Sequence, residues 1–289
     1  MKILVLGATG MLGYEVSRIC LKRGFQVDVI VRNKELLVSK LGNQVNLGVH
    51  ILDDIKNFEG LTSLIQKIKP TYIVNCIGVV KQSVLADDGY ESVSINSLLP
   101  HQLVKIGQSI GSRLIHVSTD CVFDGKKGSY KESDLPNATD LYGKSKHLGE
   151  VSYSGAVTLR TSIIGHEIGR PTHGLVEWFL SQNEKVDGFK NVFFSGLTTL
   201  ELSNVILDEV IAKNLQAGLY QVSSGRISKF DLISLIAEIY GKSITIFPNT
   251  EMVLDRSLDG TYFKELTNYI VPSWRELVQD MKNDFESGF

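Results

Sequence analysis

Residues 2–13 read Lys2-Ile3-Leu4-Val5-Leu6-Gly7-Ala8-Thr9-Gly10-Met11-Leu12-Gly13, and this stretch decides the fold. Its apolar run is typical of a buried strand, and glycines spaced three apart follow it at the start of an amphipathic helix. Gly7 permits a tight turn, Gly10 lets backbone approach a pyrophosphate, and Gly13 allows close packing of helix on strand. The helix N-terminus adds a partial positive charge that favours phosphate. The stretch therefore predicts a dinucleotide-binding loop formed by Gly7, Thr9, Gly10, Met11, Leu12 and Gly13.

The first half of the chain alternates strand-like runs with helical patterns. The expected strands are Ile3–Leu6, Val27–Val31, Leu47–Leu52, Tyr72–Asn75, Leu114–Val117 and Val157–Arg160. The expected helices are Met11–Arg23, Leu61–Ile68, Val93–Ile110 and Leu141–Val151, with a polar segment after Val31 and a polar loop over Asp124–Thr139. This alternation is the signature of βαβ units. We therefore expect an α/β fold, a doubly wound parallel sheet of the Rossmann type.

The regular alternation of strand-like and helical segments ends after Thr161. A loop and helix over Gly174–Asn183, a helix over Lys229–Tyr240 and a short strand over Ile244–Phe247 suggest a separate lobe that faces a substrate. A helix over Leu200–Leu215 and a strand over Gly218–Val222 are expected to return to the sheet. The predicted domains are 1–165 for dinucleotide binding, with 196–224 returning to it, and 166–195 with 225–289 for the smaller substrate-binding lobe.

Composition and charge limit the partners. The chain has 289 residues, 43% of them hydrophobic, and a formal net charge of −2, so we expect neither nucleic acid nor an anionic membrane as a partner. Cys20, Cys76 and Cys121 lie far apart without C-x-x-C spacing, which argues against a disulfide framework and against a metal site. No run of about 20 apolar residues occurs, and glycines break the first apolar run too early for a signal peptide. A cytoplasmic location is expected.

Several strand ends supply further candidate cofactor residues. After the second strand, Arg32 and Asn33 stand where an acidic residue would bind the ribose of NAD; Arg32 would pair with a 2′-phosphate, which favours NADP(H) with NAD(H) as the alternative. Asp54 and Ile55 follow the third strand and would flank the adenine. The remaining candidates for cofactor contact are Cys76, Ile77, Gly78, Asn96, Val117, Ser118, Tyr142, Lys146 and Thr161.

Tyr142 and Lys146 form the candidate catalytic pair. Four residues apart at the start of a predicted helix, they lie on the same helical face. A nearby ammonium stabilises a phenolate, which brings a phenol into the range useful for proton transfer. Ser118 and Thr119 deliver hydroxyls at the carboxyl end of the fifth strand, where either would hydrogen-bond a substrate carbonyl.

With these residues assembled, the chain resembles the extended short-chain dehydrogenases, and among them the dTDP-4-dehydrorhamnose reductase family most closely. The segments that carry the resemblance are Gly7–Gly13, Ser118-Thr119-Asp120-Cys121-Val122-Phe123-Asp124-Gly125, Tyr142–Lys146 with Gly149-Glu150, Leu159–Ser162, and Arg256-Ser257-Leu258-Asp259. They extend over most of the chain.

The resemblance implies reduction of a 4-keto group on a nucleotide-activated 6-deoxysugar. Hydride would pass from the nicotinamide to the carbonyl carbon while Tyr142 donates a proton to the oxygen. Lys146 would also hold the nicotinamide ribose, and Thr119 would steady the carbonyl. The expected substrate-binding residues are Thr119, Asp120, Cys121, Phe123, Trp178 and Arg256.

Three alternatives stay open. Cys121 replaces the tyrosine that the reductase family has near the sugar, and it would be either a pocket residue or an epimerising acid with His166 or His173 as its partner. An epimerase or dehydratase for nucleotide sugars would use the same Tyr142 and Lys146 without consuming cofactor. The resemblance also extends to a catalytically silent subunit, the regulatory partner of methionine adenosyltransferase. Apolar helical faces around Val93–Ile110 and Leu141–Val151 would suit a homodimer.

Overall fold

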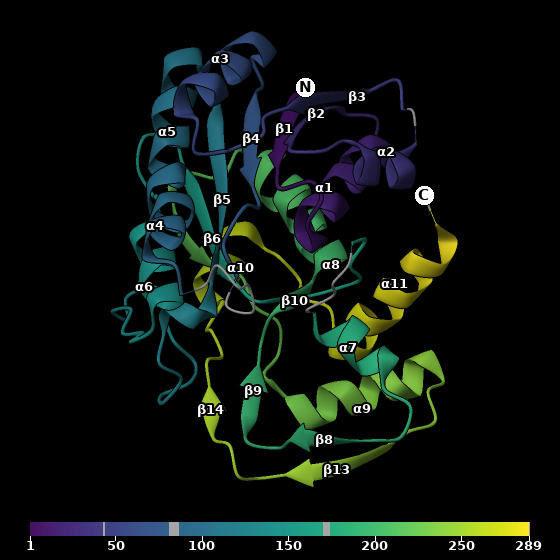
Figure 1. The fold of residues 1–289 in the computed structure, drawn as a ribbon. Coiled ribbons are helices and arrows are strands. Elements are labelled where there is room, and N and C mark those ends of the chain that lie inside the picture. Colours follow the sequence, from purple (N-terminus) through teal and green to yellow (C-terminus); the bar gives the residue numbers. More distant parts are fainter. Residues whose placement is uncertain (43, 81–86, 170–173, 289) are drawn as a thin grey trace.

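The centre of the protein is a seven-stranded parallel sheet (Figure 1). The computed structural model describes residues 1–42, 44–80, 87–169 and 174–288. Across the sheet the order is β11 (Gly218–Gln221), β6 (Val157–Thr161), β5 (Arg113–Thr119), β4 (Tyr72–Asn75), β1 (Lys2–Leu6), β2 (Gln26–Val31) and β3 (Leu47–Ile51). The chain moves outward from β1 in both directions, which confirms the predicted doubly wound sheet.

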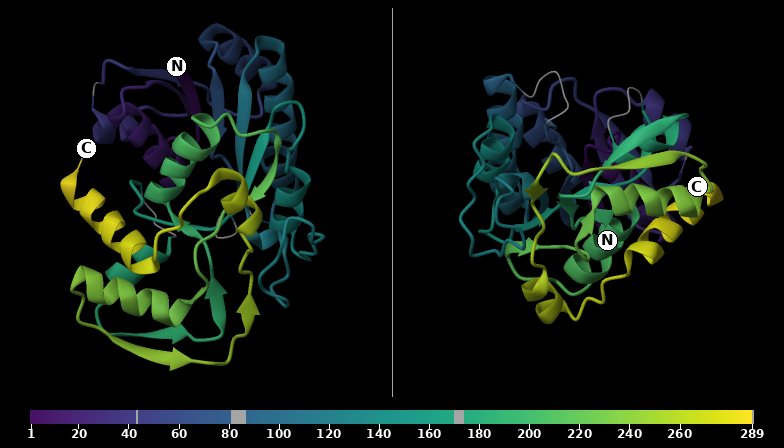
Figure 2. Two further views of the ribbon diagram at one scale, coloured as in Figure 1. Left: turned by 180° about the vertical axis from the view of Figure 1, so that it is seen from behind. Right: turned by 90° about the horizontal axis from the view of Figure 1, so that it is seen from below.

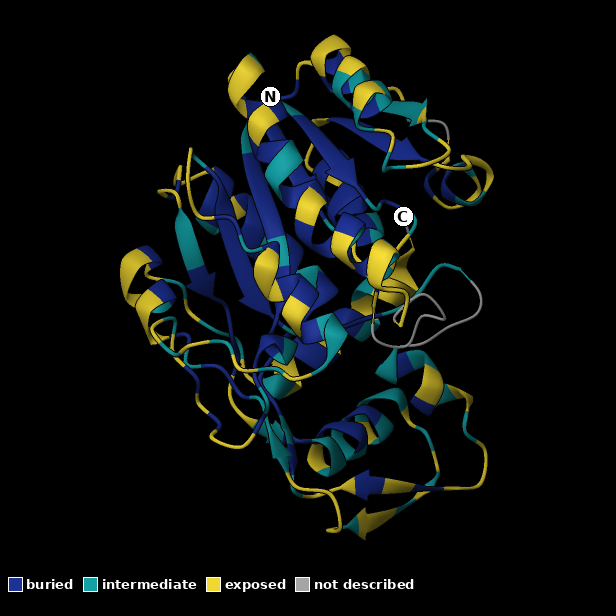
Figure 3. Ribbon diagram, turned by 60° about the vertical axis from the view of Figure 1, so that its left-hand side comes forward, coloured by how far each residue is buried: buried dark blue, intermediate teal, exposed yellow. Residues whose placement is uncertain are grey.

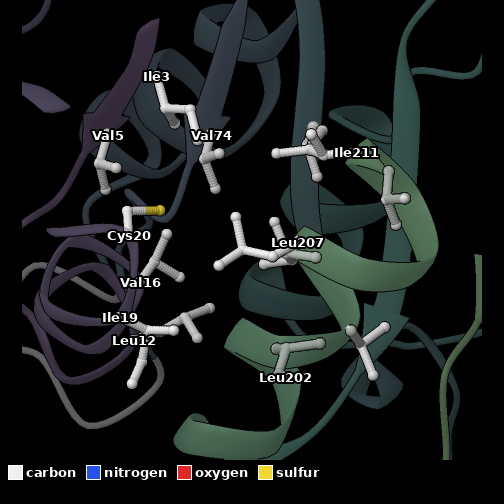
Figure 4. Packing of buried hydrophobic residues seen from close by; sticks show 14 of the residues in the cluster. Ile3, Val5, Leu12, Val16, Ile19, Cys20, Val74, Leu202, Leu207 and Ile211 are labelled. Atoms are coloured by element: carbon white, nitrogen blue, oxygen red, sulfur yellow. The ribbon is translucent and has the colours of Figure 1, made fainter. Parts of the chain in front are cut away.

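Helices cover both faces of the sheet, and each face has its own apolar core. On one face lie α1 (Met11–Lys22), α2 (Glu35–Leu41), α8 (Thr199–Val205) and the π-helix η3 (Ile206–Ile211). Figure 4 shows how Val16 and Cys20 of α1 and Leu207 of η3 pack toward Val5 and Val74 of the sheet. On the other face lie α3 (Phe58–Ile68) and α5 (Leu99–Ile110). The inner strands of the sheet are largely buried and the outward helical surfaces exposed (Figure 3), as expected for parallel strands covered on both faces.

A smaller lobe follows the sheet (Figure 2). It contains the parallel pair β8 (Lys185–Phe189) and β13 (Thr245–Asn249), and a three-stranded sheet of β9 (Val192–Phe194) between β12 (Ile227–Ser228) and β14 (Leu254–Asp255). Its helices are α7 (Leu175–Ser181), α9 (Lys229–Tyr240) and α11 (Trp274–Ser287), which share a third apolar core. Two short strands, β7 (Ile163–Ile164) and β10 (Leu197–Thr198), pair where the chain leaves and re-enters the sheet region, and α10 (Thr261–Thr267) packs near β11.

Some expected elements differ in the structure. The polar segment after Val31 contains α2, whose Leu37 and Leu41 are buried, and the strands β8 and β9 were not expected at all. The helix expected over Val93–Ile110 begins earlier, with α4 (Gly89–Ser92), and continues through the π-helix η1 (Val93–Leu98) into α5.

The helix expected over Leu141–Val151 ends sooner, as α6 (Leu141–Leu148). Gly149, which follows it, packs so tightly on η1 that a Cβ there would lie 1.9 Å from the carbonyl oxygen of Asn96. The expected return of the chain to the sheet is found, because β11 pairs in parallel with β6. The domain bounds themselves stay a prediction.

Candidate functional site

The Gly7–Gly13 loop joins β1 to α1 in a form that depends on glycine. Gly7 has a φ of +85°, in the left-handed region that side chains disfavour. A Cβ on Gly13 would lie 2.2 Å from the carbonyl oxygen of Gly7, so this helix packs directly on the turn. Gly10 caps α1 without any side-chain hydrogen bond, and the first turn carries no acidic residue. The amides at this helix end are therefore left without a side-chain acceptor, and they suit a phosphate. Thr9 and Met11 are half-buried beside them, and Leu12 is buried in the core.

The residues expected on the adenosine side lie at the ends of β2 and β3. Arg32 and Asn33 are both exposed, and the Asn33 amide oxygen accepts a hydrogen bond from the Glu35 backbone at 2.7 Å, which organises the start of α2. Asp54 is exposed, while Ile55 packs against the second core. Arg32 is thus the exposed cation at the carboxyl end of β2.

The end of β4 meets α6 through one buried amide. The Asn96 side chain of η1 accepts from the Val79 backbone at 2.9 Å and donates to Val79 and to the Ser145 hydroxyl, both at 3.1 Å. A Cβ on Gly78 would lie 3.8 Å from Lys146 Nζ, so the stretch after β4 runs past this lysine. Cys76 and Ile77 are half-buried there. Burial raises the pKa of the Cys76 thiol to about 12, which keeps it protonated.

Lys146 is buried on α6, and its ammonium donates a hydrogen bond to the Val117 carbonyl of β5 at 2.8 Å. Burial lowers its pKa to about 8, against the opposing influence of Glu150. This lysine is therefore held at the end of β5 with a proton that it gives up more easily than an exposed lysine does.

Tyr142 lies one turn earlier on α6, and its phenol is close enough to the Thr119 hydroxyl to interact with it. Burial and then the neighbouring Cys121 raise the pKa of Tyr142, while Thr119 acts in the opposite direction. The phenol is therefore a protonated group beside Thr119. Thr119 also donates to Asp120 at 3.2 Å and accepts from the Cys121 backbone at 3.1 Å.

The side chains of Ser118 and Thr119 contact different groups, because successive side chains of a strand point to opposite faces. The Ser118 hydroxyl donates to Glu150 at 2.8 Å, away from the phenol. Glu150 in turn accepts two hydrogen bonds from the buried Arg160 of β6, at 2.8 and 2.7 Å, and contacts His147 at 3.0 Å. This network ties β5, β6 and the end of α6 together. The Glu150–Arg160 ion pair was not predicted from the sequence, although a carboxylate directly after the helix and an arginine inside a buried strand are signals for one.

Asp120 and Cys121 face cations that come from the smaller lobe. Arg256 donates from Nε to the Phe123 carbonyl at 2.8 Å, and its Nη1 lies 3.8 Å from Cys121 Sγ. Lys229, the first residue of α9, interacts electrostatically with both Asp120 and Cys121. Burial raises the pKa of the Cys121 thiol to about 12. Lys229 was not predicted to lie here, because nothing in the sequence around a helix start indicates that the lobe brings it to this strand end.

Other expected site residues lie elsewhere or remain apart. Phe123 is fully buried and stacks on Tyr130 with ring centroids 4.0 Å apart, so no face of its ring is open to a substrate. Thr161 is buried and donates to the Ser162 carbonyl at 3.2 Å. Trp178 lies on α7 with 43% of its surface exposed.

The expected histidine partners of Cys121 are not found beside it. Both ring nitrogens of His166 are engaged, with Glu177 at 2.6 Å and Tyr240 at 2.8 Å. Phe285 stacks on the same ring at 3.6 Å between centroids. His173 lies outside the described residues. In the ranges that the structure describes, no cluster of His, Cys, Asp or Glu has the composition of a metal site, and no helix is both long and apolar enough to cross a bilayer.

Comparison with known proteins gives one family. A family model described as the RmlD substrate binding domain matches residues 1–286. Methionine adenosyltransferase 2 subunit beta of Danio rerio is 31% identical over 171 residues, 58% of this chain and 49% of that protein. The dTDP-4-dehydrorhamnose reductase of Shigella flexneri is 29% identical over 154 residues, 52% of this chain and 46% of that protein. The chain spans about half the length of these curated relatives.

Solved structures share the whole fold. A hypothetical dTDP-4-dehydrorhamnose reductase from Sulfolobus tokodaii has a TM-score of 0.77 and 28% identity, with 95% of this chain and 98% of that chain covered. Two structures at 20% identity, with TM-scores of 0.78 and 0.80, were solved in complex with NADP and with NAD+. Each of these two alignments covers at least 97% of both chains.

Proposed function

The chain belongs to the family of the RmlD substrate binding domain, and from that premise we propose that it is an NAD(P)H-dependent reductase of a nucleotide-activated 4-keto-6-deoxysugar. One observation carries the proposal. The phenol of Tyr142 interacts with Thr119 at the carboxyl end of β5, one helical turn from the buried Lys146, in a sheet whose first loop has the form that dinucleotide binding requires.

The residues fit a nicotinamide dinucleotide. Gly10 offers the uncapped start of α1 to the pyrophosphate, and Gly13 brings that helix close to the loop. Arg32 would pair with a 2′-phosphate, which favours NADP(H) over NAD(H). Lys146, anchored on the Val117 carbonyl, lies beside Gly78 and would hold the nicotinamide ribose. When bound, the nicotinamide supplies the hydride that reduces the carbonyl carbon.

The protein side of the reaction is a proton transfer from Tyr142. Its raised pKa keeps the phenol protonated at neutral pH, as a proton donor must be. Thr119, which lies beside that phenol, would orient the carbonyl oxygen so that it receives the proton. Ser118 is engaged by Glu150, so we assign it to holding β5 against α6. Asp120, Cys121 and Arg256 would line the sugar, and Phe123 is left out because it is buried.

The test is a turnover assay with Tyr142→Phe. Wild-type protein should consume NADPH with a dTDP-4-keto-6-deoxysugar in stoichiometric amounts, followed by absorbance of the reduced nicotinamide. The variant should lose about two to four orders of magnitude in turnover and still bind NADPH, because a phenyl ring cannot donate the proton. Tyr262→Phe, an exposed tyrosine on α10, is the matched control. Unchanged turnover in Tyr142→Phe would remove this residue from the mechanism.

Two other functions have a different outcome in the same assay. An epimerase or dehydratase would convert the sugar without net oxidation of cofactor. The likeness to methionine adenosyltransferase 2 subunit beta favours a second candidate, a non-catalytic NADP-binding subunit. If the chain is such a subunit, it should bind NADPH, show no turnover, and form a stoichiometric complex with purified methionine adenosyltransferase.

We also propose a homodimer through the helical face formed by α4, η1 and α6. Val93, Leu98 and Leu148 are exposed on it, Leu148 to 60%. Apolar side chains grouped on paired helices suit a two-fold interface, in which each patch contacts its own copy. Light scattering after gel filtration measures the mass; a monomer at micromolar concentration would contradict the proposal.

A further inference from the structure

Lys229 has an unusual place for a cation. It is the first residue of α9, directly after the N-cap Ser228, and its Nζ lies 4.2 Å from the centroid of the Phe194 ring on β9. The positive end of the helix dipole repels a cation at this position. The aromatic contact offsets only part of that cost, since cation–π attraction contributes about 0.5–2 kcal/mol.

Lys229 also lacks an ion-pair partner within the described ranges. The carboxylate in the same helical turn, Asp231, is hydrogen-bonded to Ser228 at 2.6 Å, which caps the helix. Burial lowers the pKa of Lys229 to about 8, and the Asp120 carboxylate opposes this shift without forming an ion pair with the lysine. A lysine that is partly desolvated, unpaired and placed against a helix dipole destabilises the fold. Such a residue is typical of a functional site.

The position of Lys229 links it to the proposed reaction centre. Its partner ring, Phe194, is on β9, and β9 pairs with β14, the strand that directly precedes Arg256. Asp120 and Cys121 directly follow Thr119, whose hydroxyl contacts the catalytic phenol. Arg256 contacts the same cysteine, with 3.8 Å between Nη1 and Sγ. Two cations of the smaller lobe thus act on the residues that follow Thr119 at the end of β5.

We propose that Lys229 is a substrate-positioning residue that binds a phosphate of the nucleotide sugar. The inference rests on the proposed function, because it needs a substrate in the same site. The phosphate supplies the ion pair that Lys229 lacks in the free protein, and it also meets the favourable end of the α9 dipole. The contact would hold the sugar with its carbonyl toward Thr119 and Tyr142.

The variants are chosen so that the charge alone changes. Lys229→Met keeps the length of the side chain and removes the ammonium, and Lys229→Arg restores a cation. Lys190→Met is the matched control, since Lys190 is an exposed lysine of the same lobe that lies over Phe230 at 5.1 Å. Because the removed cation is unpaired, Lys229→Met should melt no lower than wild-type protein, which shows that it folds.

Calorimetric titrations with defined probes test the phosphate contact. dTDP should bind Lys229→Met about tenfold or more weakly than wild type, the loss typical of a desolvated charge-assisted contact. UDP-glucuronate and UDP-glucose share the diphosphate and differ in a carboxylate, so the sugar preference between them should be the same in both proteins; a loss confined to UDP-glucuronate would overturn the phosphate contact. Lys229→Arg should recover most of the affinity, and Lys190→Met should match wild type throughout.

A proton count separates binding from a structural role. An anion beside Lys229 raises its pKa, so wild-type protein should take up protons when it binds the probe at pH 8.5. The uptake is measured by titration in buffers of different ionisation enthalpy. Lys229→Met should lose this uptake, whereas Lys146 contributes equally to both proteins.

The outcomes are separable. Equal affinities and equal proton uptake in wild type and Lys229→Met would overturn the role of Lys229 and leave the proposed function standing. A wild-type protein that binds none of the probes would overturn both. A wild-type protein that binds them with the expected loss in Lys229→Met, and yet oxidises no NADPH, would support Lys229 and refute the reductase.

Discussion

The burial of Lys146 predicts how the free energy of unfolding changes with pH. Burial lowers its pKa from the ordinary 10.5 to about 8, and at 1.36 kcal/mol for each pH unit the folded state disfavours the ammonium by about 3 kcal/mol. Below pH 8 both folded and unfolded chains carry the charge, so the full cost is present. Between about pH 8 and pH 10.5 the unfolded chain binds more protons, and stability from this residue rises with pH.

The perturbation is Lys146→Met. The variant loses both the cost of the buried charge and the hydrogen bond to the Val117 carbonyl, worth about 1–3 kcal/mol when a buried acceptor is left unsatisfied. At pH 7 these effects nearly cancel, so the variant should be about as stable as wild type or slightly more stable. At pH 10.5 only the lost hydrogen bond remains, and wild type should be the more stable protein.

Urea unfolding of both proteins at pH 7, 8.5 and 10 measures this difference. The free energy of unfolding of wild type, relative to Lys146→Met, should rise by about 2–3 kcal/mol across that range. Lys144→Met is the control, because Lys144 is exposed on the same helix. A difference that stays constant with pH would refute the reasoning, since it would mean that Lys146 titrates as an exposed lysine does.

Two further predictions concern the loop and the buried ion pair. Gly13→Ala should lower the free energy of unfolding in urea by about 1–3 kcal/mol, because its Cβ would lie 2.2 Å from the Gly7 carbonyl oxygen. In Gly10→Ala the Cβ would lie 3.3 Å from the same oxygen, so this variant should fold normally. It should nevertheless lose NADPH affinity in a fluorescence titration. Wild-type affinity in Gly10→Ala would refute the place of the pyrophosphate. Glu150→Gln should cost about 3 kcal/mol at pH 7 because Arg160 is left unpaired. Since Arg160 and the other hydrogen bonds hold the pKa of Glu150 below its usual 4.5, the advantage of wild type should be present above pH 4.5 and vanish as the pH falls further; a difference independent of pH would speak against the ion pair.

The sheet could be predicted because its signals are local. Each parallel strand is a short apolar run, and the glycines after Leu6 predict both the turn and the helix that follows it. The edge strand Gly218–Gln221 was also expected, although the chain leaves the sheet for more than 50 residues before it returns. By contrast β8 alternates buried and exposed positions over only five residues and contains Gly188, so its pattern is too short to distinguish from a loop.

The part of the candidate site that could be predicted is the part whose residues lie on a single helix or strand. Tyr142 and Lys146 share a helix, and their spacing alone places them on one face. The orientation of Ser118 away from the phenol follows from strand alternation once Thr119 is assigned inward, but the sequence does not say which of the two hydroxyls points in. Lys229 was missed because more than 100 residues separate it from Cys121, and only the packing of the lobe on the sheet brings the two together.

The position of β11 has a consequence for how the protein can be built and divided. Until residues 218–221 pair with β6 as β11, β6 is an edge strand of the sheet. Its unpaired backbone groups can then pair with other chains during synthesis. Residues 199–211, which shortly precede this strand, form α8 and η3, and these helices pack with α1 over one face of the sheet. The N-terminal half of the chain is therefore not expected to fold as a separate fragment. A chain cut after β6 would expose both a bare strand and an apolar sheet face, whereas an insertion at the exposed turn around Gly225 would leave the sheet complete.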